Sequence, residues 1–489
     1  MGSSSHFDVL IVGAGISGIN AAYRIQSELP HYRYSIIESR GAIGGTWDFF
    51  RYPGLRSDSD LHTFGFPWRP WASPETIADG TSIRNYLEDS AKQYGIDRKI
   101  QFHHRLVAAN WSSDDQQWSF DVDTEKGTSN ITARFLILSS GYYDYNEPLK
   151  TTIPGLDHFK GQVVHPQAWP EDLDYTDKKM VIIGSGATAI TLLPVLAKKA
   201  ARVTMLQRSP TYLLSQPSVD PIGRLLHMVL PKSLAFKLVR WKFLIIPFLF
   251  YQFCRAYPNA ARFLLRKRAE GELPKNVPHD PNFNPAYNPW EQRLCVCPDG
   301  DFFKALRAGT ADVVTDKIKN VTETGITTES GKTLDADIIV TATGLKLQLG
   351  GSVKITVDSK PIIQSEKYIW NGQMIQDVPN AVLIIGYTNA SWTLGSDSTA
   401  INVCRLLKHM DKNGMAYAVP RVPKGPKMAS RPIIDLNSTY VSKAKSILPL
   451  AGDKGPWKPR VNYIVDRWTA NYGSVTTDME FTKATKVSN

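Results

Sequence analysis

The chain has 489 residues, of which 42% are hydrophobic and 21% are charged, and its formal net charge is +11 at pH 7. This composition excludes a disordered chain, and the length predicts about three domains or one large composite. The basic balance fits anionic cofactors or a membrane surface, whereas no module typical of nucleic-acid recognition occurs in the sequence. We therefore expect small-molecule ligands and no nucleic acid.

The cysteines and the N-terminus indicate the compartment. Four cysteines are present, none of them in a CxxC pair, and Cys295 and Cys297 lack the companion ligands of a zinc site. Reduced thiols in a cytoplasmic protein without a metal are therefore expected. The first apolar run, residues 9–12, leads directly into a glycine motif, so we predict no signal peptide. The polar residues 1–6 are left out of the fold prediction.

Residues 7–18 read FDVLIVGAGISG, a short apolar run followed by Gly13, Gly15 and Gly18 in GxGxxG spacing. The spacing predicts a strand, a tight turn and a helix, in which the first glycine makes the turn. The second glycine admits a pyrophosphate, and the third lets the helix pack closely. The next strand ends at Glu38, whose carboxylate can accept hydrogen bonds from both ribose hydroxyls and repels a 2′-phosphate. This unit predicts FAD or NAD.

The same pattern returns at residues 180–189, MVIIGSGATA, where Gly184 and Gly186 keep their spacing and alanine takes the third place. Here the second strand ends at Arg208, whose planar fork suits a 2′-phosphate, and Ser209 adds a hydroxyl donor. The two units thus carry opposite charge at the ribose-reading position. The simplest division is FAD in the first unit and NADPH in the second.

The predicted fold class is α/β, with two Rossmann-like dinucleotide-binding domains and an inserted helical segment. Buried strands at 337–340 and 381–385 resemble late returns to the two nucleotide sheets, so both domains are expected to be discontinuous. The predicted division is 1–145 for the first part of the FAD domain, 146–210 for the linker and first part of the NADPH domain, 211–290 for the helical insertion, 291–375 for the second part of the NADPH domain, and 376–489 for the second part of the FAD domain and the C-terminal tail.

The longest apolar stretch, residues 243–253, is about half the length of a membrane span and contains a proline. A buried helical hairpin is the first interpretation, and a basic, apolar surface that touches a membrane is the alternative. We therefore expect a cytoplasmic protein that makes at most a weak contact with a membrane surface.

Two further motifs carry a family resemblance. Residues 159–170 match FxGxxxHxxxWP at every fixed position, and residues 45–58 read GTWDFFRYPGLRSD. On these motifs the chain resembles the type I Baeyer–Villiger monooxygenases. Segments such as RYPGLRSDSD, YNPWEQRLC and GYTNASWTL resemble the ethionamide monooxygenase subgroup within that family.

The resemblance implies an enzyme that uses FAD, NADPH and O2 to insert one oxygen atom next to a ketone carbonyl. The ester forms through a peroxide at flavin C4a, and sulfides or thioamides are implied as further substrates. Arg293 aligns with the family's active-site arginine and Asp58 with the carboxylate that faces it. A fixed cation suits the anionic peroxide and the tetrahedral adduct. His165 and Trp169 of the linker are expected to position and pack the domains rather than to touch substrate.

The motifs and the resemblance also predict the cofactor contacts. Gln292 stands where many family members carry a lysine, so Arg208 would select NADPH with less help. Residues 456–463 are the candidate for the family's tryptophan-containing substrate loop. The expected cofactor-binding residues are Gly13, Gly15, Ser17, Gly18, Glu38, Gly45, Thr46, Trp47, Asp58, Leu106, Gly184, Ser185, Gly186, Ala187, Thr188, Arg208 and Ser209.

Other functions remain open at this stage. A flavin monooxygenase that oxygenates sulfur or nitrogen would share both nucleotide folds and a related linker. A pyridine-nucleotide disulfide oxidoreductase would share the folds but needs a redox dithiol, for which no CxxC pair is present. A flavin-binding redox module without enzymatic activity is an alternative of another class. The sequence leaves the natural substrate and the oligomeric state open.

Overall fold

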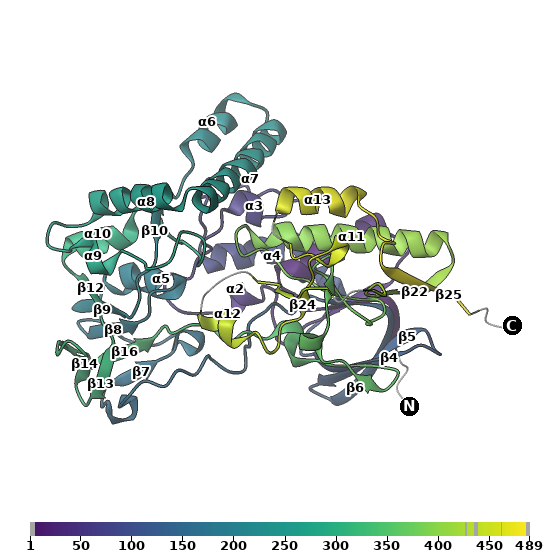
Figure 1. Cartoon of the computed structure of the whole chain (residues 1–489), viewed down its shortest axis with the longest axis horizontal. Helices are drawn as coiled ribbons and strands as arrows, with labels where there is room; N and C mark the ends of the chain where they lie inside the picture. Colours follow the sequence, from purple (N-terminus) through teal and green to yellow (C-terminus); the bar gives the residue numbers. More distant parts are fainter. Residues whose placement is uncertain (1–4, 426–427, 435–438, 461, 486–489) are drawn as a thin grey trace.

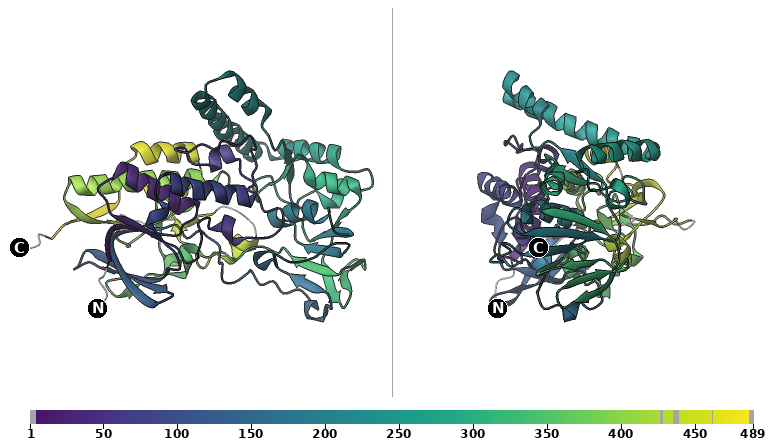
Figure 2. Two further views of the ribbon diagram at one scale, coloured as in Figure 1. Left: turned by 180° about the vertical axis from the view of Figure 1, so that it is seen from behind. Right: turned by 90° about the vertical axis from the view of Figure 1, so that its left-hand side faces the viewer.

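A computed structural model of the chain describes residues 5–425, 428–434, 439–460 and 462–485. Two lobes lie side by side along the longest axis, each built around its own sheet, and a helical hairpin projects from one edge (Figure 1). The same hairpin stands clear of the body in the other two views (Figure 2). The two-lobed α/β architecture agrees with the predicted fold class.

The first apolar run forms β1, the central parallel strand of the first lobe. It pairs in parallel with β2 on one side and with β6 on the other. The long strand β6 also pairs antiparallel with β5, and β21 joins its C-terminal half in parallel. The nine described strands of this sheet are β1 (Ser5–Val12), β2 (Tyr34–Ile37), β3 (Ile100–Gln101), β4 (Arg105–Ser112), β5 (Gln117–Thr124), β6 (Gly127–Leu138), β17 (Lys354–Val357), β18 (Lys360–Pro361) and β21 (Ala381–Leu383).

Helices cover one face of the first sheet and bury its apolar side chains. The helix after the glycine turn, α1, packs against α11, and both contribute fully buried residues such as Ile19 and Leu407 to one core cluster. Figure 1 shows α4 and α11 along the same side. The helices of this lobe are α1 (Ile16–Glu28), α2 (Thr46–Phe49), α3 (Leu61–Phe64), α4 (Gly80–Gln93), α11 (Trp392–Lys412), α12 (Thr439–Lys443) and α13 (Tyr463–Tyr472).

The second lobe is built on a five-stranded, fully parallel sheet in the order β12-β9-β8-β16-β7. The helix after the second glycine turn, α5, packs on this sheet with α10. The predicted late returns are confirmed, because β16 joins this sheet and β21 joins the first. Its elements are β7 (Gln162–Val164), β8 (Lys179–Ile183), α5 (Ala187–Leu196), β9 (Arg202–Gln207), α10 (Asp301–Ala308), β12 (Ala311–Thr315), β16 (Ile338–Thr341) and the small sheet β13 (Ile318–Thr322), β14 (Gly325–Thr328) and β15 (Thr333–Asp335).

The helical insertion lies between the paired strands β10 (Leu213–Gln216) and β11 (Cys295–Pro298). The interpretation of residues 243–253 as a buried hairpin is wrong, because Ile246 and Leu249 of α7 are 54% and 58% exposed. The helix is covered along only part of its circumference, so one face stays in solvent. In the part of the chain that the structure describes, no helix is long and apolar enough to cross a bilayer. The helices of the insertion are α6 (Pro221–Val229), α7 (Lys232–Ala256), α8 (Pro258–Glu272) and α9 (His279–Asn282).

Strand pairing corrects two expectations. Residues 354–361, predicted to lie in the NADPH domain, form β17 and β18, and β17 pairs with β4 of the first sheet. His6, left out of the fold prediction, pairs with Thr132 inside β1 and β6. The remaining described strands form three short pairs, β19 (Ile369–Trp370) with β20 (Met374–Ile375), β22 (Met415–Pro420) with β25 (Met479–Lys483), and β23 (Arg431–Pro432) with β24 (Leu450–Ala451).

Candidate active site

The first glycine turn has the close contacts that its spacing predicts. Gly13 has a φ of +104°, and a Cβ at this position would lie 2.8 Å from the Ser139 carbonyl oxygen. A Cβ on Gly18 would lie 1.9 Å from the Gly13 oxygen, so only glycine lets α1 pack this closely on the turn. Gly15 is the N-cap of α1, where the unpaired helical N–H groups favour an anion.

Glu38 closes this turn from the end of β2. Its carboxylate is 7% exposed and accepts hydrogen bonds from the backbone N–H groups of Ala14 (2.8 Å) and Arg40 (3.0 Å). These two bonds fix both oxygens beside the glycine turn and still leave lone pairs free. The arrangement suits the two hydroxyls of a ribose and disfavours a phosphate there.

The motif at 45–47 lies directly opposite this turn. Gly45 has a φ of +55°, and a Cβ on it would come within 3.1 Å of the Gly15 Cα. The Thr46 hydroxyl lies 3.0 Å from the Tyr145 hydroxyl, and the Trp47 ring packs edge-on against Phe64. The two turns therefore form a narrow backbone cradle that a larger side chain would fill.

At two predicted cofactor contacts, Ser17 and Leu106, the side chain interacts within the protein itself. The Ser17 hydroxyl accepts a hydrogen bond from the indole N–H of Trp392 (2.8 Å), which leaves its backbone N–H at the start of α1 for a phosphate. Leu106 is buried in the core of the first sheet with Val12 and Ile37. Any contact of these residues with a cofactor therefore involves the backbone or the nearest methyl groups.

The second glycine turn is more open at its tip. Gly184 has a φ of +137°, and a Cβ on it would lie 2.2 Å from the Ala342 oxygen, so this position needs glycine. A Cβ on Gly186 would meet no atom within 4 Å, which leaves free space in front of α5. The Ser185 hydroxyl donates to the Ser209 carbonyl (2.7 Å) and ties the turn to the end of β9.

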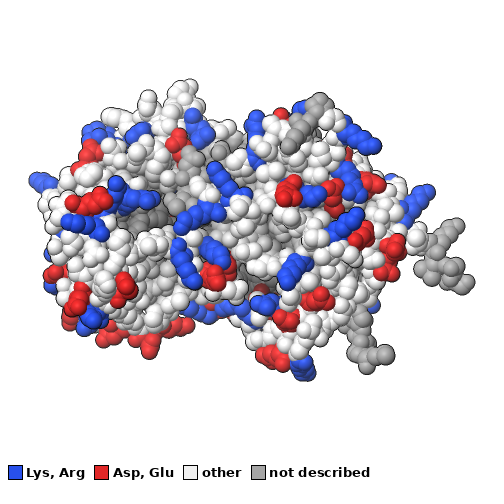
Figure 3. All heavy atoms as spheres, turned by 60° about the horizontal axis from the view of Figure 1, so that its bottom comes forward, with Lys and Arg blue, Asp and Glu red and all other residues white. Residues whose placement is uncertain are grey.

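A cavity of about 1220 Å³ joins the second turn to the predicted catalytic residues. Asp58 from the first lobe and Arg293 from the loop before β11 both line it. Lys and Arg side chains also gather along the middle of the molecule, where the lobes meet (Figure 3). The lining includes all seven residues predicted for the second nucleotide: Gly184, Ser185, Gly186, Ala187, Thr188, Arg208 and Ser209.

Asp58 lies in a strongly desolvated and positively charged corner of this cavity. Burial raises the pKa of its carboxyl to about 6, although the charges of Arg56 and Arg293 oppose this shift. The Arg293 charge thus acts on the Asp58 carboxyl. Sequence reasoning missed Arg56, which donates to the Val296 carbonyl (3.2 Å) and forms an ion pair with Asp301. Arg56 therefore ties the Asp58 loop to the second lobe.

The loop before Arg293 contains a second residue that the sequence analysis missed. Trp290 has a φ of +69°, in the left-handed region that favours glycine, and its side chain lines the cavity. Its indole N–H is buried and has no hydrogen-bond partner among the described residues. A buried donor of this kind is costly unless a ligand accepts its hydrogen bond. Trp290 stands out by its positive φ, a feature of the folded loop that the sequence does not show.

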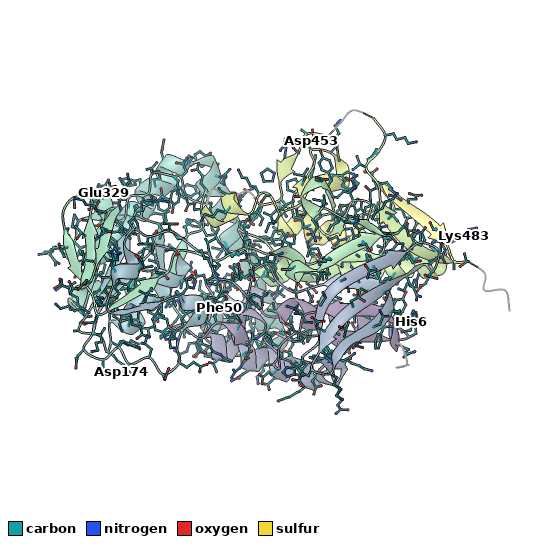
Figure 4. The ribbon with its side chains drawn as sticks, turned by 90° about the horizontal axis from the view of Figure 1, so that it is seen from below. His6, Phe50, Asp174, Glu329, Asp453 and Lys483 are labelled. Carbon is teal, nitrogen blue, oxygen red and sulfur yellow. The ribbon has the colours of Figure 1, made fainter. Side chains whose placement is uncertain are left out.

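An aromatic cluster connects the two lobes near this cavity. Phe50 lies in the middle of the molecule, between the lobes (Figure 4). Its ring contacts Tyr52 (6.0 Å between centroids) and Tyr143 (6.2 Å), of which Tyr143 also lines the cavity. Of the candidate substrate segment 456–463, Tyr463 lines the cavity, whereas Trp457 is buried in the first core. Position 461 lies outside the described residues.

The linker histidine and tryptophan lie apart from the residues that line the cavity. Nδ1 of His165 accepts the Gln167 N–H (3.1 Å), and burial holds the pKa of its imidazole below the usual 6.5. Trp169 is 8% exposed and packs in the core of the second lobe. Trp169 is thus a packing residue, whereas Nε2 of His165 is buried and has no hydrogen-bond partner among the described residues.

The cysteines form neither a disulfide nor a metal site in the described structure. All four are buried and unpaired. Across the described ranges, no group of three or more His, Cys, Asp or Glu side chains could hold a metal ion.

Comparison with known proteins gives the family. A family model described as pyridine nucleotide-disulphide oxidoreductase matches residues 10–223. The FAD-containing monooxygenase EthA of Mycolicibacterium smegmatis is 47% identical over 482 residues, which cover 98% of both chains. An oxidized steroid monooxygenase bound to NADP superposes with a TM-score of 0.74 at 21% identity, over 98% of this chain and 100% of that one. The ε-caprolactone-bound cyclohexanone monooxygenase gives a TM-score of 0.71 at 19% identity and the same coverage.

Two nucleotide-type turns on separate lobes, with a charged cavity where the lobes meet, define a two-nucleotide oxidoreductase. The chain belongs to the family of FAD-containing monooxygenases that includes EthA, and it is therefore a flavin monooxygenase. This confirms the resemblance that the motifs predict.

Proposed function

We propose that the protein is an FAD- and NADPH-dependent Baeyer–Villiger monooxygenase that converts a ketone and O2 into an ester. The observation that carries this proposal is the cavity itself. It brings the predicted active-site arginine, Arg293, and its carboxylate partner, Asp58, together with the second nucleotide turn. A cyclohexanone monooxygenase crystallised with the lactone ε-caprolactone is similar to this chain in fold, which supports a Baeyer–Villiger reaction.

FAD is assigned to the first turn and NADPH to the second. The cradle between Gly15 and Gly45 fits a pyrophosphate that approaches the backbone, and Glu38 stands where the ribose hydroxyls would lie. In the second unit, the space in front of Gly186 and the guanidinium of Arg208 fit a 2′-phosphorylated nucleotide. When bound, NADPH would supply two electrons and FAD would carry them to O2.

The chain's own residues supply charge and position. Arg293 places a cation in the cavity where negative charge develops on the substrate oxygen, as a donor in an oxyanion hole does. Asp58 balances this cation, and Arg56 holds the Asp58 loop against the second lobe. The free indole N–H of Trp290 is available to a carbonyl or amide oxygen in the same cavity.

The proposed substrates are small-molecule ketones, with sulfides or thioamides as a second class. Apolar side chains of α7, among them Phe243, Pro247 and Phe250, also line the cavity. A flavin monooxygenase that acts only on sulfur or nitrogen is the second candidate, since its nucleotide sites would be the same. It would not need a cation held for a tetrahedral oxygen adduct.

Product analysis separates these candidates. The purified yellow protein is incubated with NADPH, air and 2-octanone, and the products are examined by gas chromatography. Hexyl acetate that depends on NADPH supports the proposal. Absence of the ester, together with sulfoxide formation from a thioether, would replace it with sulfur oxygenation. Absence of both products and of NADPH consumption would favour a flavin-binding module without enzymatic activity.

Replacing Arg208 with alanine is expected to raise the KM for NADPH by about 10- to 100-fold, because charged hydrogen bonds contribute about 1.5–3 kcal/mol each. The KM for NADH should change by less than about twofold, since NADH lacks the 2′-phosphate that the fork binds. Arg202→Ala is the matched control, because Arg202 begins the same strand and pairs with Asp312 outside the cavity. Equal effects on both coenzymes would remove Arg208 from the 2′-phosphate site.

The kcat/KM for the ketone is expected to fall as the pH drops through about 6, the raised pKa of Asp58. Above this pH the carboxylate is charged and balances Arg293, whereas below it the carboxyl is neutral and the pairing is lost. Because kcat/KM reports ionisations of the free enzyme, its acid limb should show this pKa. Asp58→Asn should lower activity throughout and abolish this limb. A limb that persists unchanged in the variant would assign it to another group.

A cytoplasmic location with weak contact to a membrane surface is also part of the proposed function. The support is the exposed apolar face of α7, on which Trp241 and Leu249 are each 58% exposed. Large exposed apolar patches are rare on soluble monomers and usually mark a surface that binds another protein or a membrane.

A further inference from the structure

The long helix α7 has two apolar faces that point in opposite directions. At about 100° per residue, side chains spaced by three or four positions lie on one face. The cavity-lining face consists of Phe243, Ile246, Pro247 and Phe250. On the opposite side, 41–58% exposed, are Leu234, Leu238, Trp241, Ile245 and Leu249. The same helix is thus a wall of the cavity and an uncovered apolar surface.

Helix α13 lies against α7 and adds exposed aromatic side chains next to it. Its first residue, Tyr463, lines the cavity, donates its hydroxyl proton to the Leu244 carbonyl and packs against Phe248 (5.8 Å between centroids). Farther along α13, Trp468 is 62% exposed and Tyr472 is 72% exposed. Figure 1 shows α6, α7 and α13 along one edge of the molecule.

The cavity reaches the surface at Ile246, on the side of α7 that faces away from Leu244 and Phe248 and therefore from α13. Ile246 lines the cavity and is nevertheless 54% exposed. Pro247, next to it, has no N–H and cannot bond to the Phe243 carbonyl one turn earlier. The wall of the cavity is therefore locally weakened at the point where it meets solvent.

Helices α6 and α7 carry lysine and arginine and no acidic residue. Residues 221–268 contain ten Lys or Arg and no Asp or Glu, in a chain whose net charge is +11. Arg224, Lys232, Lys237 and Arg255 are exposed and form no ion pair with any residue that the structure describes. Lys242, Arg266, Lys267 and Arg268 pair with Asp220, Glu270, Asp280 or Glu272, so the unpaired positive charge lies mainly at the four exposed residues on α6 and α7.

These features favour an anionic lipid bilayer as the partner that binds this surface. Apolar helices with exposed tryptophan and tyrosine and with flanking lysine and arginine bind in the interface of anionic bilayers. A second copy of the chain would bring the same positive charge against the first, which disfavours self-association through this face. Helix α7 has 25 residues but too many charged side chains to span a bilayer, so the helices would lie in the plane of the interface.

We propose that α6, α7 and α13 rest on an anionic lipid surface and that a lipid-dissolved ketone enters the cavity past Ile246 of α7. The proposal rests on the proposed ketone oxygenation and concerns how a ketone dissolved in lipid reaches the cavity. Such a ketone passes from the acyl region to the apolar wall of the cavity without crossing water. Its carbonyl then reaches the charged corner at Arg293.

The test uses the flavin-loaded enzyme with 2-hexadecanone in vesicles of phosphatidylglycerol or of phosphatidylcholine, and with 2-octanone in buffer. We expect cosedimentation with phosphatidylglycerol vesicles only. Turnover of 2-hexadecanone should be more than about tenfold faster in those vesicles than in phosphatidylcholine, because adsorption places the cavity at the lipid. Turnover of 2-octanone should not depend on either lipid.

Surface variants separate this route from the chemistry. Leu238→Ser combined with Trp241→Ser removes apolar area outside the cavity and should weaken vesicle binding by more than about tenfold. Lys232→Glu combined with Lys237→Glu should abolish the preference for the anionic lipid. Both variants should oxidise 2-octanone at the wild-type rate. Ile363→Ser, at a 53% exposed apolar residue outside these helices, is the matched control and should behave as wild type.

Each failure has its own meaning. If 2-octanone gives no ester in any condition, the proposed function fails, whatever the lipid results. If 2-octanone is oxidised but the enzyme binds neither vesicle, the lipid surface is rejected. Concentration-dependent dimers that the Leu238→Ser and Trp241→Ser changes abolish would then assign the face to a second copy. If the enzyme binds vesicles but turnover of 2-hexadecanone is the same in both lipids, entry from the bilayer is rejected.

Discussion

Arg293→Ala is expected to purify with bound FAD and to form ester about 10²- to 10³-fold more slowly than wild type, the usual cost of losing one charge-stabilising donor. The guanidinium lies in the cavity together with Asp58 and the second nucleotide turn, so its loss removes the cation on which substrate charge would develop. FAD binding should persist, because Gly15 and Glu38 lie in the other lobe. Ester formation is followed by gas chromatography, and flavin content by the visible spectrum.

The conservative variant sharpens this prediction. Arg293→Lys keeps the charge but not the planar fork, and it should recover part of the lost rate. NADPH oxidation that continues in Arg293→Ala, with hydrogen peroxide in place of ester, would show that the cofactors still react and that the defect lies in oxygen transfer. Ester formed at the wild-type rate would exclude Arg293 from the reaction.

Local spacing predicted the nucleotide turns because their geometry depends on a few neighbouring residues. Gly18 must lack a side chain since a Cβ there would overlap the Gly13 oxygen, and the strand–turn–helix order follows from that contact. Glu38 and Arg208 end the second strands of their units, so their positions beside the turns follow from the same pattern. These features need no knowledge of distant contacts.

Features that depend on distant partners could not be predicted in the same way. The strand at 354–357 pairs with β4, some 246 positions earlier in the chain, and a four-residue apolar pattern does not specify its sheet. The hydroxyl of Ser17 is occupied by Trp392, and Arg56 bonds to Val296, although the sequence near each residue shows neither partner. The apolar run of α7 predicts a helix but not whether another element covers it.

Gly15→Ala and Gly186→Ala should separate the two nucleotide sites. Each glycine caps its helix with a φ of −80°, which alanine adopts freely, so neither substitution strains the backbone. A Cβ on Gly15 would lie 3.5 Å from Gly45 Cα, an ordinary contact, and a Cβ on Gly186 would touch nothing. Both proteins should therefore fold, and the new methyl group should occupy only the space of a bound pyrophosphate.

We expect Gly15→Ala to purify without its yellow colour, because losing one or two charged hydrogen bonds to the pyrophosphate, each about 1.5–3 kcal/mol, weakens FAD binding by about 10-fold to more than 100-fold. Gly186→Ala should stay yellow, with a KM for NADPH raised over a similar range. Flavin absorbance and coenzyme kinetics measure the two effects, and circular dichroism confirms the fold. Loss of FAD from Gly186→Ala, with normal FAD in Gly15→Ala, would reverse the assignment of the cofactors. Loss of FAD from both would show that the second turn also supports the flavin, since the cavity connects that turn to Asp58 of the first lobe.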